Sequence, residues 1–243
     1  MAELRALVAA AGSGSRAGLP YPKTLFPIRG KPILVLILEL LAPYDGKPTV
    51  IVSPSGEEPI RQRLAQHGMA AHLVAQPEPR GMGDAVLRFA QSPAYEDTEH
   101  VLLVWGDIPF IQPETVAAVV AAHKAQGNHF TFATRQAQSA YTLVLRDPAG
   151  QVTRVIETRE EDGGQTRPGE REIGLFVFRK TVVLNMLREE LSGKWGRSTG
   201  EHGFLYIVEH MVSRGLRVAA LPVATELDLV SLNSIEDVEA YLS

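Results

Sequence analysis

Short apolar runs and helix-length amphipathic stretches alternate along the first half of the chain. Apolar runs rich in β-branched residues predict buried strands at residues 4–9, 49–52, 71–74 and 101–105. The stretches between them, several opened by proline or closed by glycine, predict helices at 32–41, 57–67, 83–90 and 113–125. This alternation predicts an α/β fold with a Rossmann-like, doubly wound and mostly parallel sheet.

From about residue 141 the pattern changes. Strand-like segments at 141–146 and 151–157 flank the turn sequence Asp147-Pro148-Ala149-Gly150 and predict a hairpin. Further strands are predicted at 173–178 and 216–223, and helices at 181–191, 204–213 and 235–242. Residues 160–170 are polar and charged, which predicts a mobile loop. We expect one domain over 1–243, with a small β-rich lobe inserted into the sheet in its second half.

A glycine-rich loop follows the first predicted strand, with the sequence V-A-A-A-G-S-G-S-R-A-G-L-P-Y-P-K over residues 8–23. Gly12 and Gly14 allow tight bends that leave backbone N–H groups free for an anion. Arg16 can place two donors on a phosphate, and Lys23 adds a compact mobile charge. The pattern indicates a loop that binds a triphosphate, although an ordinary strand-to-loop connection is the alternative.

Two common glycine motifs do not fit this loop. A P-loop needs Gly-Lys followed by Ser or Thr, whereas Lys23-Thr24 is preceded by Pro22. A dinucleotide fingerprint opens directly into a helix, and Pro20 and Pro22 prevent one here.

Two further segments follow predicted strands, where open α/β sheets bind ligands. Asp107 comes after a run of apolar residues and can hold a hard divalent cation, or cap the turn before Pro109. In the second segment, Q-P-E-P-R-G-M-G-D, Gln76 can hydrogen-bond a base edge and Gly81 allows close approach. A simple helix-capping loop is the alternative for the second segment.

Composition excludes several classes of protein. The 243 residues contain no cysteine, which rules out disulfides and thiolate chemistry. The formal net charge of −4 argues against a nucleic-acid partner. The longest apolar run, 33–42, is about half a membrane span and contains Glu39, so no membrane partner is expected. With no signal peptide visible, we expect a cytoplasmic protein.

Along the chain, the motifs are A-A-G-x-G-x-R…P-K, G-M-G-D, W-G-D-I-P, V-T-R-V-I-E, G-L-F-V-F, G-E-H-G-F-L and L-N-S-I-E-D. Taken together in this order, they resemble the sugar-1-phosphate nucleotidylyltransferases, and most of all the uridylyltransferase domains of N-acetylglucosamine-1-phosphate uridylyltransferases. The resemblance covers nearly the whole chain. The hexapeptide-repeat acetyltransferase domain of the bifunctional members is missing, so acetyl transfer is not expected.

The resemblance implies a role for each matching residue. It makes Arg16 and Lys23 catalytic, and Asp107 and Asn233 ligands of Mg²⁺. The nucleotide-binding residues would be Ala10, Ala11, Gly12, Gly14, Gln76, Gly81 and Met82, and the sugar-binding residues Thr142, Glu157 and Glu172. It also divides the domain into a nucleotide-binding half at about 1–140 and a sugar-binding lobe with closing elements at about 141–243.

Three residues depart from the family pattern. Met82 stands where the family has threonine, Thr142 where it has glycine, and Glu172 where it has asparagine. The expected reaction is attack of a sugar-1-phosphate on the α-phosphate of a nucleoside triphosphate, UTP above all. A cytidylyltransferase acting on a sugar or polyol phosphate is the alternative, followed by a catalytically idle nucleotide-binding homologue and then a dehydrogenase. The sequence leaves the sugar and the oligomeric state open.

Overall fold

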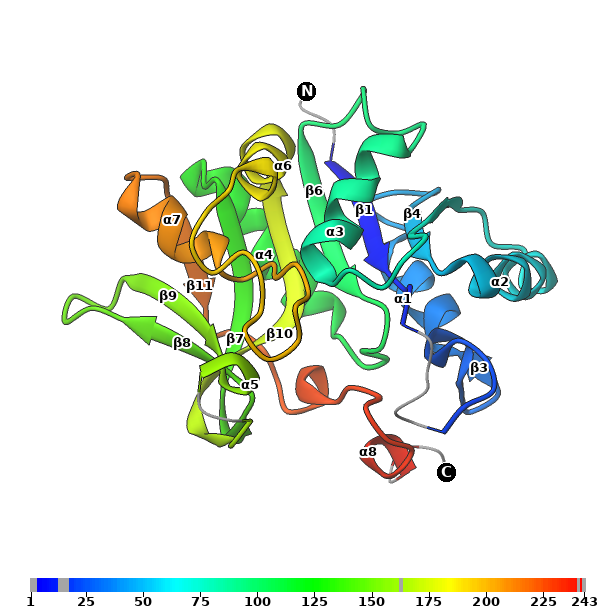
Figure 1. Ribbon diagram of the computed structural model, residues 1–243. Coiled ribbons are helices and arrows are strands. Elements are labelled where there is room, and N and C mark those ends of the chain that lie inside the picture. The colour runs from blue at the N-terminus through cyan, green and yellow to red at the C-terminus, as the bar shows by residue number, and fades with distance from the viewer. Residues whose placement is uncertain (1–3, 13–17, 162–163, 240, 242–243) are drawn as a thin grey trace.

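A mixed sheet runs through the middle of the molecule, of which the computed structural model describes residues 4–12, 18–161, 164–239 and 241 (Figure 1). Within these residues the sheet has seven strands in the order β11-β7-β10-β6-β1-β4-β5. They are β1 (Leu4–Ala9), β4 (Thr49–Val52), β5 (His72–Ala75), β6 (His100–Trp105), β7 (Phe130–Ala140), β10 (Arg167–Arg179) and β11 (Val218–Leu221). Neighbouring strands are parallel except at β10, which is antiparallel to β6 and β7. The predicted α/β class is confirmed.

Helices cover both faces of the sheet (Figure 1). One face packs against α1 (Ile33–Leu41), α2 (Pro54–Gln66) and α4 (Pro113–Gln126), and the other against α3 (Met82–Leu87), α6 (Lys180–Arg188) and α7 (Ile207–Ser213). Alternate residues of β1 enter the two cores, since Ala6 and Val8 face the first and Leu7 the second. This is the period-2 alternation of a strand buried on both sides.

Smaller elements lie around the sheet. They are the hairpins β2 (Pro27–Ile28) with β3 (Lys31–Pro32) and β8 (Thr142–Arg146) with β9 (Val152–Glu157), the helices α5 (Thr158–Glu161) and α8 (Glu236–Glu239), and 3₁₀ turns at Lys23–Leu25, Arg88–Gln91 and Leu227–Leu229. The predicted hairpin around residue 148 is therefore present as β8 and β9. None of the helices in the described segments is long and apolar enough to cross a membrane.

The predicted mobile loop at 160–170 is wrong at both of its ends, whereas residues 164–166 do lie in turn and irregular structure. Its first residues belong to α5, and from Arg167 onward the chain is already strand β10, which pairs with β7 as far back as Ala140. The polar side chains have partners as well, because Glu170 accepts hydrogen bonds from Arg146 at 2.6 and 2.7 Å. A polar sequence forms a strand here because a neighbouring strand pairs with its backbone and an arginine pairs with its carboxylate.

Candidate active site

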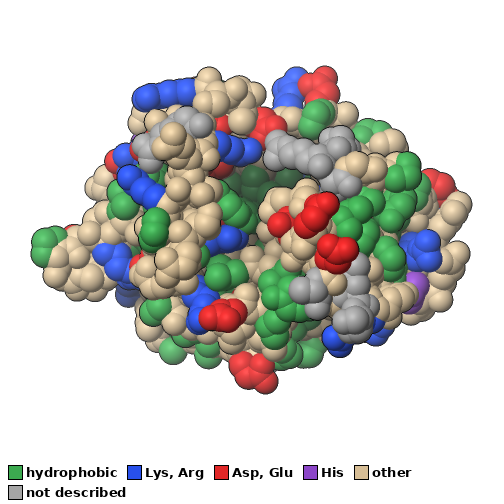
Figure 2. Space-filling view, turned by 90° about the horizontal axis from the view of Figure 1, so that it is seen from below, with side chains coloured by type: hydrophobic (Ala, Val, Ile, Leu, Met, Phe, Trp, Pro, Cys, Tyr) green, Lys and Arg blue, Asp and Glu red, His purple; other side chains and the backbone are tan. Residues whose placement is uncertain are grey.

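A cavity of about 410 Å³ opens at the face where the parallel strands have their carboxyl ends. Figure 2 looks onto this face and shows a hollow bordered by both basic and acidic side chains. Six of the residues predicted for the site line this cavity: Lys23, Met82, Asp107, Thr142, Glu157 and Asn233. They come from segments far apart in the sequence, so the fold brings the predicted phosphate, metal and sugar residues together.

Lys23 and Asp107 form an ion pair in the lining of the cavity. Lys23 begins the 3₁₀ turn after the glycine-rich loop, and Asp107 follows β6 directly. Their side chains keep 26% and 15% of their surface exposed, so a ligand can reach both. The lysine of such a pair can exchange the carboxylate for a phosphate oxygen, and the carboxylate can exchange the lysine for a metal cation.

Asp107 and Asn233 supply oxygen donors suited to a hard cation. The segment that carries Asn233 is fixed to the end of β6 by a hydrogen bond from Leu232 N–H to the Asp107 carbonyl, 2.8 Å. The Asn233 amide nitrogen donates to Ser231 Oγ at 2.9 Å, which leaves its amide oxygen for a ligand. The described residues hold no cluster of three or more His, Cys, Asp or Glu that could bind a metal. A carboxylate plus an amide fits Mg²⁺, which takes few protein ligands and completes its shell with phosphate oxygens and water.

The start of the glycine-rich loop lies beside Lys23. Ala10 is buried at the end of β1, Ala11 is half-buried, and a Cβ added to Gly12 would lie 3.0 Å from Lys23 Cε. Gly14 and Arg16 lie outside the described residues, so their predicted roles stay predictions.

The second loop is held in shape by Gln76. This side chain is only 5% exposed, and its amide nitrogen donates to the Gly81 carbonyl at 3.0 Å and to Asp84 at 2.9 Å. Burial alone would raise the pKa of Asp84, but the hydrogen bonds from Arg88 and Gln76 lower it. Gln76 and Gly81 do not line the 410 Å³ cavity, whereas Met82 does. Nucleobase contact by Gln76 therefore stays a prediction, and in this structure the side chain orders the loop.

Gly81 packs against the segment 193–203, which we call the strap. His202 donates its backbone N–H to the Arg80 carbonyl at 2.7 Å, and its own carbonyl accepts from Gly83 N–H at 3.0 Å. Gly81 has φ +98°, and a Cβ there would lie 2.5 Å from the His202 carbonyl oxygen. The predicted nucleotide loop and the strap are therefore in direct backbone contact.

We expect Gly81→Ala to destabilise the fold by about 2–4 kcal/mol, because it adds a backbone clash to an unfavourable φ. Gly150→Ala is the matched control, since Gly150 has φ +81° and nothing within 4 Å of the added Cβ. Urea unfolding of both variants separates the clash from the backbone strain. Equal losses in the two would contradict a close contact between loop and strap.

Of the predicted sugar-binding residues, Thr142 and Glu157 line the cavity, and Glu172 lies behind Thr142. Glu172 is fully buried, accepts a hydrogen bond from Thr142 Oγ1 at 3.1 Å, and accepts another from Gly174 N–H at 2.5 Å. Burial raises the pKa of Glu172 to about 7, against the lowering effects of Arg171 and these hydrogen bonds. The structure therefore places Glu172 as a support for Thr142, and direct contact with a sugar stays a prediction.

This raised pKa has a consequence for stability. Between the ordinary pKa of 4.5 and about 7, the folded chain keeps the Glu172 proton that the unfolded chain releases, so stability falls as pH rises through this window. The full loss is on the order of 3 kcal/mol. We expect Glu172→Gln to remove this slope between pH 5 and pH 8 in urea unfolding. Glu170→Gln, on the same strand but with a lowered pKa, should keep it.

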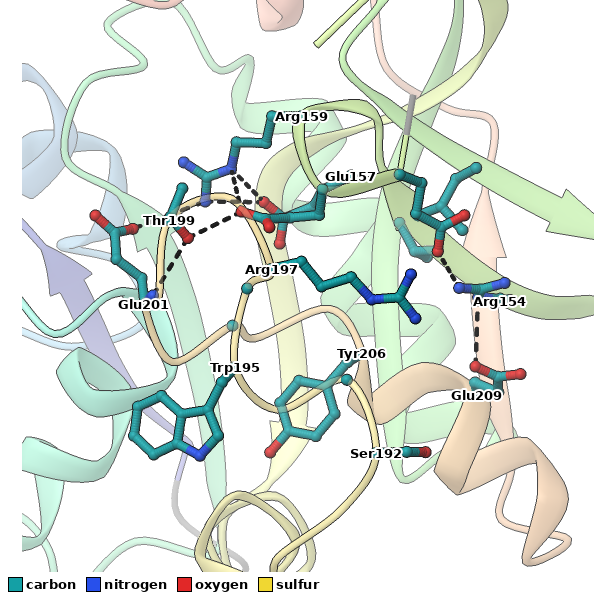
Figure 3. A pocket seen from close by; sticks show the side chains of 17 residues that line it. Arg154, Glu157, Arg159, Ser192, Trp195, Arg197, Thr199, Glu201, Tyr206 and Glu209 are labelled. Atoms are coloured by element: carbon teal, nitrogen blue, oxygen red, sulfur yellow. Dashed lines mark hydrogen bonds and ion pairs between the residues drawn. The ribbon is translucent and has the colours of Figure 1, made fainter. Parts of the chain in front are cut away.

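A second pocket, of about 220 Å³, adjoins the main cavity and shares Glu157, Arg159, Glu201 and Gly203 with it (Figure 3). Arg159 pairs with Glu157 at 2.9 Å and with Glu201 at 3.8 Å, which joins β9 to the strap. Burial raises the pKa of Glu157, and Arg159 opposes that rise. The three charged side chains form the wall between the two pockets and hold Glu157 in place.

Several residues that line the main cavity were not singled out as site residues in the sequence. They are Trp105, Tyr141, Arg159, Glu201 and His202. Burial, with help from Lys194, lowers the pKa of His202 to about 4, so it is neutral at physiological pH. Glu201 and His202 belong to the motif G-E-H-G-F-L, which could have directed attention to them. For Arg159 the sequence carries no comparable signal.

Known proteins share this fold and sequence pattern. The model of the MobA-like NTP transferase domain matches residues 6–172. Bifunctional protein GlmU of Heliobacterium modesticaldum is 28% identical over 242 residues, which cover 98% of this chain and 51% of that protein. GlmU of Symbiobacterium thermophilum is 30% identical over 239 residues, 96% of this chain and 49% of that protein. The chain spans about half the length of the curated relatives it matches.

Solved structures confirm the fold. The inositol-1-phosphate CTP transferase from T. maritima superposes with a TM-score of 0.73 at 17% identity, covering 99% of this chain and 94% of that one. A protein from Bacillus anthracis assigned as a glucose-1-phosphate thymidylyltransferase, in complex with a sucrose, gives 0.73 at 12% identity, with 98% and 93% covered.

The chain belongs to the family of MobA-like NTP transferase domains, and it is a nucleotidyltransferase. Within that class, the resemblance to the sugar-1-phosphate nucleotidylyltransferases is confirmed by the match to GlmU along almost the whole chain.

Proposed function

We propose that this protein transfers a nucleotidyl group from a nucleoside triphosphate, UTP above all, to a sugar-1-phosphate. An oxygen of the sugar phosphate attacks the α-phosphorus and forms a new P–O bond. The bond between the α-phosphorus and the bridging oxygen breaks, and pyrophosphate leaves with that electron pair. The attacking phosphate is largely ionised at neutral pH, since its second pKa is about 6, so the step needs no general base.

Catalysis then depends on position and charge. Asp107 and Asn233 would hold Mg²⁺, which when bound neutralises phosphate charge and aligns the phosphate oxygens. Lys23, which pairs with Asp107 in the lining of the cavity, would exchange this partner for the triphosphate and stabilise the charge that develops on it. Arg16 would add a second cation from the glycine-rich loop. We assign 1–140 to nucleotide binding and 141–243 to acceptor binding and closure.

One observation carries the proposal most directly. A single cavity is lined by Lys23, Asp107 and Asn233 and also by Thr142 and Glu157. A cation, a pair of metal-type oxygen donors and groups able to bind hydroxyls are what a bound triphosphate and a sugar phosphate require. This arrangement supports transfer rather than a catalytically idle nucleotide-binding protein.

The test is release of pyrophosphate, with MgCl₂, from a panel of UTP, CTP, dTTP, ATP and GTP against common sugar-1-phosphates. We expect turnover with UTP and at least one hexose-1-phosphate. Turnover with CTP and a polyol phosphate would instead support the cytidylyltransferase. Absence of pyrophosphate release with every pair would overturn the proposal.

A further inference from the structure

Arg171 is a buried arginine without a carboxylate partner. It lies on β10, is 8% exposed, and forms no ion pair with an acid anywhere in the described segments. Its Nε donates to the Glu172 carbonyl at 3.3 Å and its Nη2 donates to the Tyr141 hydroxyl. The guanidinium carbon lies 4.0 Å from the centre of the Tyr141 ring. Nη1 has no hydrogen bond to these parts of the chain.

Such a group is unusual, because a buried charge normally has a counter-ion. The tyrosine ring and the backbone carbonyl stabilise the cation only partly. Local rules of this kind are broken chiefly at functional sites, where a ligand supplies the missing partner. The position of Arg171 identifies that site.

Arg171 borders a small cavity of about 70 Å³ behind the metal-type donors. Asp107, Asn233, Tyr141 and Trp105 line this cavity and also the 410 Å³ cavity, so the two adjoin. Trp105 adds a second donor without an acceptor, since its indole Nε1 is buried and makes no hydrogen bond to the described chain. Arg171 and Trp105, each with one donor that makes no hydrogen bond to the described chain, therefore border one cavity next to the proposed magnesium ligands.

The chemistry of this cavity favours an anionic oxygen group. Its other acid, Asp228, is already saturated by hydrogen bonds from Gln112 N–H, Thr115 and Thr225. A guanidinium with free N–H groups beside a divalent cation site is well suited to a phosphate, whose oxygens can contact both.

The cavity belongs to the acceptor side. Its lining comes from the end of β6 and the residues after it, from Tyr141 between β7 and β8, from β10 and from the segment 228–233. No residue of the loops 10–12 or 76–84 takes part. The neighbouring residues Arg171 and Glu172 point to opposite faces of β10, where Arg171 borders the small cavity and Glu172 supports Thr142. The two faces of β10 thus contribute to different parts of the acceptor site, Arg171 on one face and Glu172, through Thr142, on the other.

We propose that Arg171 binds the phosphate group of the acceptor and orients its attacking oxygen toward the α-phosphorus; this rests on the function proposed above. Arg171 is a specificity-determining residue for an acceptor that carries a phosphate monoester. In this proposal the triphosphate is bound by the glycine-rich loop, Lys23 and the metal donors, and not by Arg171.

The experiment compares Arg171→Met and Arg171→Lys with Arg135→Met. Arg135 is the register partner of Arg171 on β7 and pairs with Glu226 away from the cavity, so it is the matched control. Pyrophosphate release gives the KM for each substrate, and a ³¹P NMR titration with inorganic phosphate and MgCl₂ measures anion binding without turnover. Thermal unfolding checks that each variant is folded.

For Arg171→Met we expect the KM for the sugar-1-phosphate to rise about 10- to 100-fold, with the KM for the triphosphate changed less than about 2-fold. Inorganic phosphate should bind at least about 10-fold more weakly, and Arg171→Lys should recover part of both losses. Arg135→Met should behave as the wild type. If Arg171→Met is unfolded, the folded Arg171→Lys carries the test, because a single ammonium cannot replace the forked contact.

Failure of this proposal is distinct from failure of the proposed function. An unchanged acceptor KM in Arg171→Met, or an equal rise in both KM values, overturns the role of Arg171 while turnover stands. If the wild type releases no pyrophosphate with any pair, but phosphate binding depends on Arg171, the function fails and the anion site is supported. Phosphate binding that is the same in wild type and Arg171→Met overturns the site.

Discussion

Lys23→Ala is expected to lower kcat by about 10²- to 10³-fold, the usual cost of removing one group that stabilises charge in the transition state. The KM for the triphosphate should rise less than about 10-fold, because the loop amides and the metal donors remain. The reason is the position of Lys23 beside Asp107: in the proposed function, a cation on the carboxylate frees the Lys23 ammonium to contact phosphate oxygens. Steady-state kinetics of pyrophosphate release measure both quantities.

Lys31→Ala is the control for this result. Lys31 lies in the same part of the chain, but its ammonium is exposed and pairs with Glu39 at 2.8 Å on the surface. Lys31→Ala should change kcat and the KM for the triphosphate by less than about 2-fold, as expected for the loss of a surface ion pair. A Lys23→Ala enzyme with near-normal kcat would show that the transition state does not depend on this cation.

Asp107→Asn is the second change with a large expected effect. It removes the charged oxygen donor proposed for Mg²⁺, and we expect apparent Mg²⁺ affinity to fall by more than the roughly 10- to 100-fold that loss of an outer-shell partner costs. Titration of activity with MgCl₂ should move to higher concentration, with part of the rate recovered at saturation.

Asp107→Asn also removes the ion-pair partner of Lys23, so the effect of losing the ion pair must be distinguished from the effect of losing the metal ligand. The double variant Lys23→Ala, Asp107→Asn provides this separation through a double-mutant cycle. Asp97→Asn, at an exposed acid remote from the cavity, should leave the Mg²⁺ dependence as it is. A Mg²⁺ titration of Asp107→Asn that matches the wild type would remove Asp107 from the metal site.

Much of this fold follows from the sequence because local signals agree with it. The strands at 4–9 and 49–52 have their predicted bounds, since each is an apolar run buried on both faces. The missed strand β7 begins with the buried residues Phe130–Ala133 but continues into polar residues, and its pairing with β10 extends it. The start of β10 is a strand for the same reason, which sequence polarity alone cannot show.

Some residues of the candidate site could likewise be predicted from the sequence, and others could not. Lys23, Asp107 and Asn233 could be predicted because each stands in a motif, and the structure places them in one cavity. Arg171 and Arg159 could not, because their importance comes from what surrounds them: a cavity in one case and two carboxylates in the other. Glu172 was singled out because it replaces the family's asparagine, and only the fold shows that its carboxylate accepts a hydrogen bond from Thr142 from behind the cavity wall.

The two tryptophans give this protein optical probes at separate places. Trp105 borders both cavities beside Asp107, whereas Trp195 lies on the strap with 48% of its surface exposed. The emission of an indole responds to its surroundings, so the Trp195→Phe variant keeps one fluorophore, Trp105, that reports on the two cavities beside Asp107. The complementary Trp105→Phe variant reports on the strap, and comparing the two after substrate is added shows which region responds first.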